Sequence, residues 1–143
     1  TTENTYRRLK KHGGIRMIRE KKHKLQLSLS ETEREVVEYI WDHSGEVRTS
    51  DIYSYFRKSR VQWARQTLNT LLLRVAEKGI IERPQRGMVK AKYSRAEYDS
   101  LCCREFVETR FNGNIANAIR CYYNGPIPEN EAQELIDCIN FMR

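Results

Sequence analysis

The chain has 143 residues, a formal net charge of +7 and a hydrophobic content of 39%. This apolar content suffices for a core, but no apolar run approaches the ~20 residues that a membrane-spanning helix needs. Residues 1–29 also lack the apolar stretch of a signal peptide. Composition therefore excludes a membrane protein and predicts one domain, or two small ones, in the cytoplasm.

The positive charge is concentrated in two segments. Residues 1–29 hold 9 basic and 2 acidic side chains, and residues 57–93 hold 10 basic and 2 acidic ones. Residues 30–56 hold 2 basic and 7 acidic side chains, and residues 94–143 hold 5 and 8. Two such basic segments are attracted to a polyanion, and nucleic acid is the obvious candidate.

The first basic segment predicts a flexible arm over residues 1–28. Gly13-Gly14 interrupts any long helix, although a short helix is expected near Ile15–Lys22. Such an arm could follow a phosphate backbone or enter a minor groove. The alternative is a solvated tail without a ligand.

The packed part of the chain is expected to begin with a helix over residues 29–41. Ser30 and Glu33 form an S-x-x-E capping box, in which the serine oxygen accepts a backbone N–H and the glutamate reaches back. The helix should end between residues 43 and 45. Its expected buried stripe consists of Val36, Val37, Ile40 and Trp41.

A second, shorter helix is expected over residues 49–58. Thr49 or Ser50 is the expected N-cap, and Asp51 suits the positive end of the helix. Its expected inner face consists of Ile52, Tyr55 and Phe56.

The third helix runs from Thr67 to Lys78, where Gly79 provides a stop signal. Its apolar residues recur at helical spacing, and its other face is polar. An ordinary amphipathic helix with a solvated polar face is the alternative to a helix that reads DNA. The apolar face consists of Leu68, Leu71, Leu72, Val75 and Ala76, and the polar face of Gln66, Asn69, Thr70 and Arg74.

After Gly79 the pattern changes to alternation, which predicts a β-hairpin. A short strand over residues 80–83 ends at Pro84, and residues 85–87 form the turn. The second strand spans residues 88–93. One face of it consists of Val89, Ala91 and Tyr93, and the other of Met88, Lys90 and Lys92.

Three helices followed by a basic hairpin are typical of a winged helix-turn-helix domain, here over residues 29–94. In such a domain the third helix enters the DNA major groove and the hairpin lies on the flanking backbone. Amide side chains can bind adenine and threonine can contact the thymine methyl group, so A·T pairs are expected. A winged helix that contacts protein instead is the alternative. The expected base-reading residues are Gln66, Thr67, Asn69 and Thr70, and the expected phosphate-binding residues are Arg65, Arg74, Arg86, Lys90 and Lys92.

Residues 95–143 are expected to form three short helices, separated by Asn112-Gly113 and Asn124-Gly125-Pro126. The fold class is therefore mainly α with a small β-hairpin wing. About fifty residues close a core poorly on their own, so the apolar faces of these helices need a partner. A second copy is the simplest partner, and a two-fold dimer would place two recognition helices on a palindromic site. The expected dimerisation residues are Leu101, Phe106, Ile119, Leu135, Ile136 and Ile139.

The segments LSETEREVVEYIW and VQWARQTLNTLLLRVAEKGIIE, the hairpin ending in KYS and the three closing helices resemble the penicillinase-repressor family (BlaI/MecI/CopY type) over residues 29–143. Its most specific part is W-x-x-x-T-L-x-T-L-L-x-R-V-x-x-K-G from Trp63 to Gly79. The resemblance implies a homodimeric repressor on palindromic operators of β-lactamase, penicillin-binding-protein or metal-resistance genes. It also implies that Gln66, Thr67, Asn69 and Thr70 face DNA, and that a sensor protease triggers cleavage in the first dimerisation helix.

The chain departs from the family pattern at three places. Ala64 stands where the family often has a serine that could cap the recognition helix. Glu105-Phe106 stands where the family has its cleaved Asn-Phe bond. The paired C-x-C motifs of the copper-sensing branch are absent from the C-terminal part of the sequence.

The sequence offers no catalytic set and no cofactor motif. His12, His23 and His43 lack ligand or triad spacing, so an enzyme is not expected. Two other binding functions are left open: an architectural, mostly non-specific DNA binder that uses the arm, and a thiol or metal sensor that uses the cysteines. None of the cysteines has zinc-module spacing, and buried thiols are expected rather than disulfides. They are Cys102, Cys103, Cys121 and Cys138.

Overall fold

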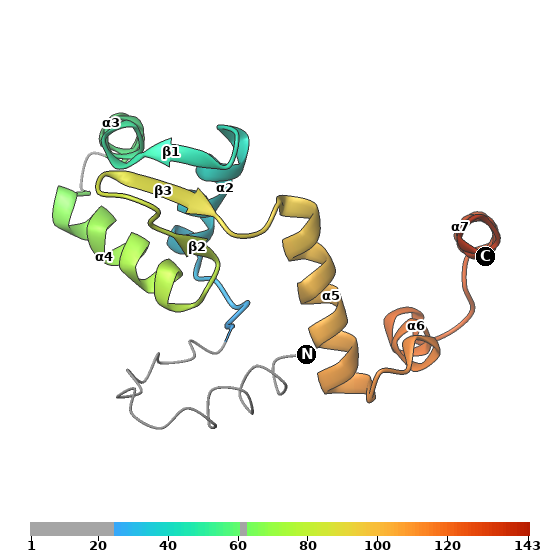
Figure 1. Cartoon of the computed structure of the whole chain (residues 1–143). Coiled ribbons are helices and arrows are strands. Elements are labelled where there is room, and N and C mark those ends of the chain that lie inside the picture. Colours follow the sequence, from blue (N-terminus) through green and yellow to red (C-terminus); the bar gives the residue numbers. More distant parts are fainter. Residues whose placement is uncertain (1–24, 61–62) are drawn as a thin grey trace, which may run out of the picture.

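The computed structural model describes residues 25–60 and 63–143 (Figure 1). Residues 1–24, with the short helix predicted near residues 15–22, lie outside the described residues, as do residues 61–62 of the turn before the third helix. The elements are α2 (Glu31–Asp42), β1 (Glu46–Arg48), α3 (Thr49–Ser59), α4 (Arg65–Glu77), β2 (Ile81–Glu82), β3 (Met88–Ala91), α5 (Arg95–Phe111), α6 (Ile115–Tyr123) and α7 (Glu129–Met142).

Helix α2 begins at the predicted capping box. The Ser30 hydroxyl accepts a hydrogen bond from the Glu33 backbone N–H at 3.2 Å, and the Glu33 carboxylate accepts one from the Ser30 N–H, also at 3.2 Å. Two backbone donors that the first helical turn leaves free are thereby satisfied. The helix ends at Asp42, with His43 as C-cap, within the expected region.

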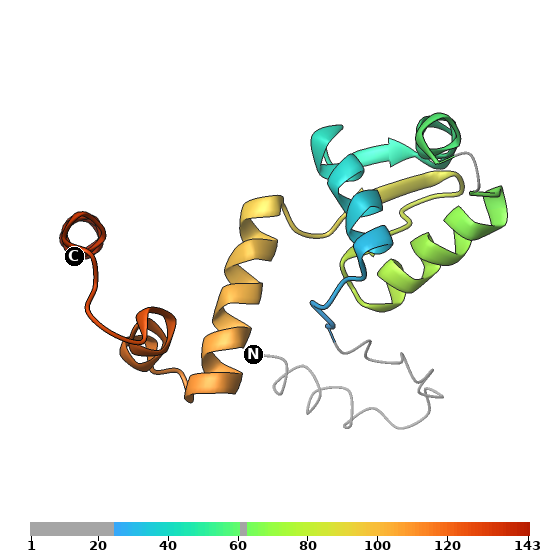
Figure 2. The same ribbon diagram turned by 180° about the vertical axis from the view of Figure 1, so that it is seen from behind.

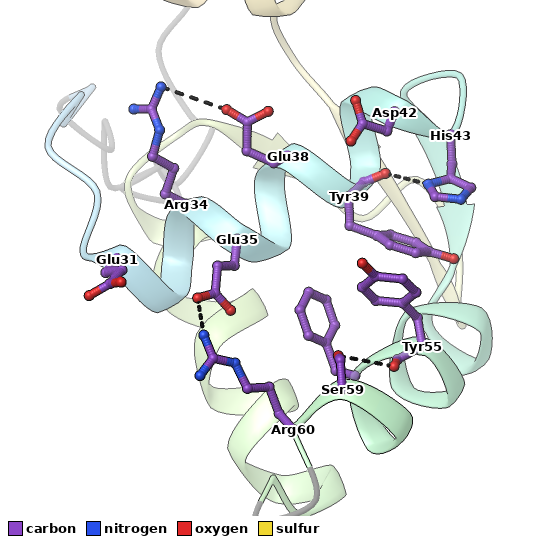
Figure 3. A pocket seen from close by; sticks show the side chains of 11 residues that line it. Glu31, Arg34, Glu35, Glu38, Tyr39, Asp42, His43, Tyr55, Ser59 and Arg60 are labelled. Carbon is purple, nitrogen blue, oxygen red and sulfur yellow. Dashed lines mark hydrogen bonds and ion pairs between the residues drawn. The ribbon is translucent and has the colours of Figure 1, made fainter.

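The structure corrects the start of α3 and one residue of its inner face. Neither Thr49 nor Ser50 is the N-cap, because both already lie inside the helix. The N-cap is Arg48, whose side chain makes no capping bond. A short strand, β1, occupies the residues before α3 and sets this boundary. Tyr55 is 51% exposed instead of buried, since it lies against Tyr39 at the rim of a groove between α2 and α3 (Figure 3).

That groove has a volume of about 520 Å³ and an acidic wall from α2 (Figure 3). Arg60 pairs with Glu35 across it, and Arg34 pairs with Glu38 along α2 (Figure 3). Arg95 pairs with both Glu38 and Asp42. These wall carboxylates are Glu31, Glu35, Glu38 and Asp42.

The sheet has three antiparallel strands in the order β1-β3-β2, so the predicted hairpin gains a third strand. Strand β3 lies in the centre, and its alternation is as expected: Val89 is fully buried, while Lys90 is exposed. The backbone N–H of Thr49 donates to Gly87 O at 2.9 Å, which ties the hairpin turn to the start of α3. The turn of the wing is therefore fixed beside the helix-turn-helix rather than free.

Residues 25–29 belong to the folded domain, which corrects the prediction of an arm over residues 1–28 for residues 25–28. Leu27 is 7% exposed and Leu25 packs against the core. The Gln26 backbone N–H donates to Lys78 O at 2.9 Å, and the Tyr98 hydroxyl donates to Leu27 O. Two leucines at alternate positions cover the end of α4. Their packing fixes this short segment against the domain, although the residues before it are basic.

The buried core lies between α2, α3, α4 and the sheet. Nearly all of its side chains come from residues 27–89, and Tyr98 on α5 completes it. Burial and the nearby Cys102 raise the pKa of Tyr98 far above its ordinary value, so its hydroxyl stays protonated and remains a donor. The core residues are Leu27, Val36, Val37, Ile40, Val47, Ile52, Phe56, Leu68, Leu71, Leu72, Val75, Ile80, Ile81, Val89 and Tyr98.

Helix α5 follows β3 after a short connection and carries the chain away from the winged helix (Figures 1 and 2). Its first turn is held on α2: Trp41 Nε1–H donates to Tyr93 O at 2.8 Å, and Arg95 bonds to Glu38 at 2.5 Å and to Asp42 at 2.7 Å. Helices α6 and α7 lie farther out, separate from the sheet in both views.

The four cysteines are all free thiols, as expected, but they are not all buried. Cys102 is half-buried against the core, whereas Cys103, Cys121 and Cys138 are exposed. The expectation of burial fails because the last three lie on helices that find no covering surface within one chain.

Candidate nucleic-acid interface

Helix α4 presents one polar face to solvent. Its apolar residues Leu68, Leu71, Leu72 and Val75 are buried against the core, as the periodicity predicted. The opposite face therefore points outward along the whole helix (Figure 1). Of the predicted base-reading residues, Gln66 and Thr67 are exposed, while Asn69 and Thr70 are half-buried at the sides of this face.

The start of α4 is positioned by aromatic contacts rather than by a cap. Its N-cap is Ala64, which makes no side-chain capping bond. Trp63 stacks on Phe56 of α3 with ring centroids 4.9 Å apart, and the Arg65 guanidinium lies over the Tyr53 ring at 5.0 Å. These contacts join the start of α4 to α3 and so constrain the angle between the two helices.

One of the polar side chains on α4 forms a hydrogen bond within the helix, and two others do not. The Thr70 hydroxyl donates to Gln66 O at 2.9 Å, which leaves its methyl group and oxygen lone pairs for an external partner. Gln66 and Asn69 have no side-chain hydrogen bond among those found in the described residues. Their amides are therefore available to base edges.

The other end of α4 carries charges that act inside the domain. Lys78 donates to the Glu33 carboxylate at 2.5 Å, and the Glu33 side chain is 6% exposed. Burial acts to raise the pKa of Glu33, but the bonds from Lys78 and Ser30 and the charge of Arg74 outweigh it and lower the pKa. Arg74, predicted to bind phosphate, thus lies near a buried carboxylate as well as on the outer surface.

The three cations predicted on the hairpin wing have different surroundings in the structure. Arg86 is exposed and belongs to the turn between β2 and β3. That turn lies at the same end of the domain as the start of α4 (Figure 1). Lys90 is paired in register with Glu46 of β1 and Glu82 of β2, so two carboxylates flank it on the sheet surface. Lys92 lies still farther from the turn, beside the connection to α5.

Sequence reasoning missed two cations at the turn end of the sheet. Arg48 ends β1 opposite Met88, the first residue after the turn, and Arg83 follows β2 directly. Both are exposed. Arg83 could have been recognised from the predicted hairpin, whereas Arg48 could not, because its position depends on the pairing of β1 with β3.

The predicted dimerisation residues divide into two groups. Leu101 is half-buried and packs against the core of the winged helix, so its side chain already has a partner within the chain. Phe106, Ile136 and Ile139 are 55%, 51% and 55% exposed, and Ile119 and Leu135 are half-buried. Further exposed apolar side chains nearby are Ile115, Tyr122, Phe141 and Met142.

Three comparisons with known proteins bear on this site. A family model described as penicillinase repressor matches residues 29–140. The chain belongs to the penicillinase repressor family. The resemblance seen in the sequence is thereby confirmed, and with it the coarse function of a DNA-binding transcriptional repressor.

Two individual proteins are similar to this chain. The chain is 25% identical over 111 residues to the penicillinase repressor of Bacillus licheniformis, and the match covers 75% of this chain and 85% of that protein. It is also similar to the solution structure of the DNA-binding domain of the repressor BlaI, with 27% identity and a TM-score of 0.45. That match covers 52% of this chain and 93% of the BlaI domain.

Residues 25–60 and 63–143 contain neither a membrane-spanning helix nor a cluster of metal-ligating side chains. None of the helices in this part of the chain combines the length and apolarity that crossing a bilayer requires. Nor do three His, Cys, Asp or Glu side chains gather there in a way that could hold a metal ion.

Proposed function

We propose that the chain is a sequence-specific repressor that binds a palindromic operator as a homodimer. Helix α4 enters the major groove, and Gln66, Thr67, Asn69 and Thr70 contact base edges. The single observation that carries this proposal is the outward polar face of α4, with a basic turn at the same end of the domain (Figure 1).

Phosphate contacts are assigned by position in the domain. Arg65 and Arg86 lie at the end where α4 begins, together with Arg48 and Arg83. Arg74, Lys90 and Lys92 remain candidates, but the two flanking carboxylates reduce the attraction that Lys90 offers to a phosphate. We therefore expect Arg86 to contribute more to binding than Lys90.

The homodimer is proposed from the unpartnered apolar side chains of α5, α6 and α7. Ile136, Ile139 and Phe141 are 51%, 55% and 92% exposed, which is costly for isolated helices in water. A second copy covers such faces with a closed two-fold contact. Control of antibiotic- or stress-resistance genes and inactivation by a sensor protease are proposed from the family alone.

The first test is enrichment of random duplexes by the purified full-length protein at near-physiological salt, followed by sequencing. An A·T-containing palindrome with half-sites about one helical turn apart, or a multiple of it, supports the proposal. Binding without enrichment, which vanishes steeply as salt rises, would mean phosphate attraction alone.

The charge of the arm favours a second candidate, an architectural binder that recognises DNA with little sequence preference. Residues 1–29 carry 9 basic and 2 acidic side chains. Deleting residues 1–24 distinguishes the two and leaves Leu25 and Leu27 in the core. A repressor keeps its operator preference after this deletion, whereas an architectural binder loses nearly all of its affinity.

Replacing Asn69 and Arg86 separately by alanine tests the division of roles. Asn69→Ala should relax the preference at one base pair by about 1–3 kcal/mol. Arg86→Ala should weaken all duplexes alike and flatten the salt dependence, because one phosphate contact is lost. Equal effects of both variants on every duplex would contradict the assignment.

A further inference from the structure

Leu73 is the one large apolar side chain that α4 leaves exposed in the described residues. Its exposed fraction is 53%, whereas Leu72 beside it is fully buried. It takes no part in the core cluster. Packing of the domain therefore does not account for a leucine at this position.

Helix geometry places Leu73 in the middle of the outward face. At 3.6 residues per turn, it lies above Gln66, two turns earlier, and above Asn69 and Thr70, one turn earlier. These are the residues proposed to read base edges. Thr67 and Arg74, by contrast, project toward one side of the same face.

We propose that Leu73 reads thymine by contacting its 5-methyl group. The inference rests on the proposed function and extends the reading face of α4 by one turn. The thymine methyl is the apolar group that base edges display in the major groove, and an apolar side chain is its natural partner. Among the exposed residues of this face, Leu73 alone offers a purely apolar surface.

The spacing along the helix agrees with this role. Leu73 lies four residues beyond Asn69, which is about 6 Å along the helix axis. A base-pair step is about 3.4 Å, so the two side chains are about two steps apart along the groove. The thymine read by Leu73 is therefore expected about two base pairs from the base contacted by Asn69.

The test uses full-length protein and the enriched operator duplex. Each thymine is replaced in turn by deoxyuridine, which removes only the methyl group, and the Kd is measured for each duplex. We expect one thymine per half-site at which the replacement weakens binding about fourfold, as expected for one methyl group removed from contact. In Leu73→Ala the same replacement should have no effect.

Two variants serve as controls. Leu73→Met keeps an apolar side chain of similar volume and should retain the sensitivity to deoxyuridine. Ile127→Ala removes an exposed apolar side chain in the connection between α6 and α7 and should also retain it. Sensitivity that is equal in the wild type and in Leu73→Ala, or absent from the wild type at every thymine, overturns the inference but leaves the repressor function standing.

Other results separate the two proposals. If no operator is enriched at all, the proposed function fails and the inference fails with it. If Leu73→Ala changes the oligomeric state of the DNA-free protein, Leu73 covers a protein contact and the inference is wrong. Sedimentation of wild type and variant at matched concentrations measures this.

Discussion

The two halves of the chain use similar amphipathic helices, but only one of them buries its apolar faces. Among the described residues, every buried hydrophobic side chain from Leu27 to Val89 belongs to the winged helix. In the region from α5 onward Tyr98 alone is buried, and it packs on the winged helix. Amphipathic sequence therefore predicts that a face will be covered, but not by which chain.

The difference shows what a sheet contributes to so small a core. Helices α2 and α4 pack on each other, and α2 also packs on β3 and α4 on β2, so each apolar face meets another within the same chain. Helices α5, α6 and α7 follow one another outward and lack such a layer (Figure 2). The first region is organised by its own contacts, and the second requires a partner surface.

The largest expected effect comes from Ile136→Asp combined with Ile139→Asp in α7. Two charges on the proposed contact face should abolish the dimer and lower operator affinity at least about 100-fold, because the two half-sites are no longer bound together. Sedimentation and titration with operator DNA measure the two effects. Asn140→Asp adds a charge to an exposed position of the same helix and is the control. A double variant that stays dimeric would contradict the view that the region from α5 onward needs this face to be covered by a second chain.

The next effect concerns the stability of the winged helix itself. Leu72→Ala removes a fully buried side chain and should lower the free energy of unfolding by about 2–5 kcal/mol. Leu73→Ala, one residue along the same helix, should change it by less than about 0.5 kcal/mol. Urea denaturation of both variants measures the difference. Equal losses would show that Leu73 is covered within the chain.

Glu33→Gln tests the contact that joins α2 to the end of α4. Loss of the charged bond to Lys78 should cost about 1.5–3 kcal/mol near neutral pH. Because the pKa of Glu33 is lower in the folded chain than its ordinary value of 4.5, the ionised carboxylate stabilises the fold above that value. This contribution is lost as the pH falls through the lowered pKa. The difference in unfolding free energy between wild type and variant should therefore shrink in acid, and a difference independent of pH would refute the assignment.

The smallest effect is a gain in stability. Ala64 has the extended backbone of an N-cap but no side-chain acceptor. Ala64→Ser should supply one and stabilise the chain by about 0.5–1 kcal/mol, provided that the serine oxygen reaches a free N–H of the first turn. Thermal unfolding measures the change. Ser94→Ala, which removes the existing cap of α5, should produce a loss of similar size.

Much of the fold could be predicted because its signals are local. The capping box at Ser30, the helix stop at Gly79 and the alternation around Val89 each depend on a few neighbouring residues. Strand β1 could not be predicted in this way, since three residues become a strand only by pairing with β3, about forty positions later. Leu25 and Leu27 were assigned to the arm because the residues before them are basic, while their contacts with α4 and α5 are distant in sequence.

The candidate site was predicted less completely than the fold. Helical periodicity placed Gln66, Asn69 and Thr70 on the outward face, because the same period buries the apolar residues opposite them. The same periodicity left Leu73 out of the apolar face, but it did not indicate what a leucine does on the outward face. Arg48 and the carboxylates flanking Lys90 depend on sheet register, which a single hairpin pattern does not specify.

The first turn of α5 has a consequence for operator architecture. Trp41, Arg95 and Tyr98 hold this turn on the winged helix, so the direction in which α5 leaves the domain is fixed. In the proposed dimer, that exit angle sets how far apart the two α4 helices lie, and hence how many base pairs separate the half-sites. A substitution at this joint could therefore shift the preferred operator length while every contact with the bases stays the same.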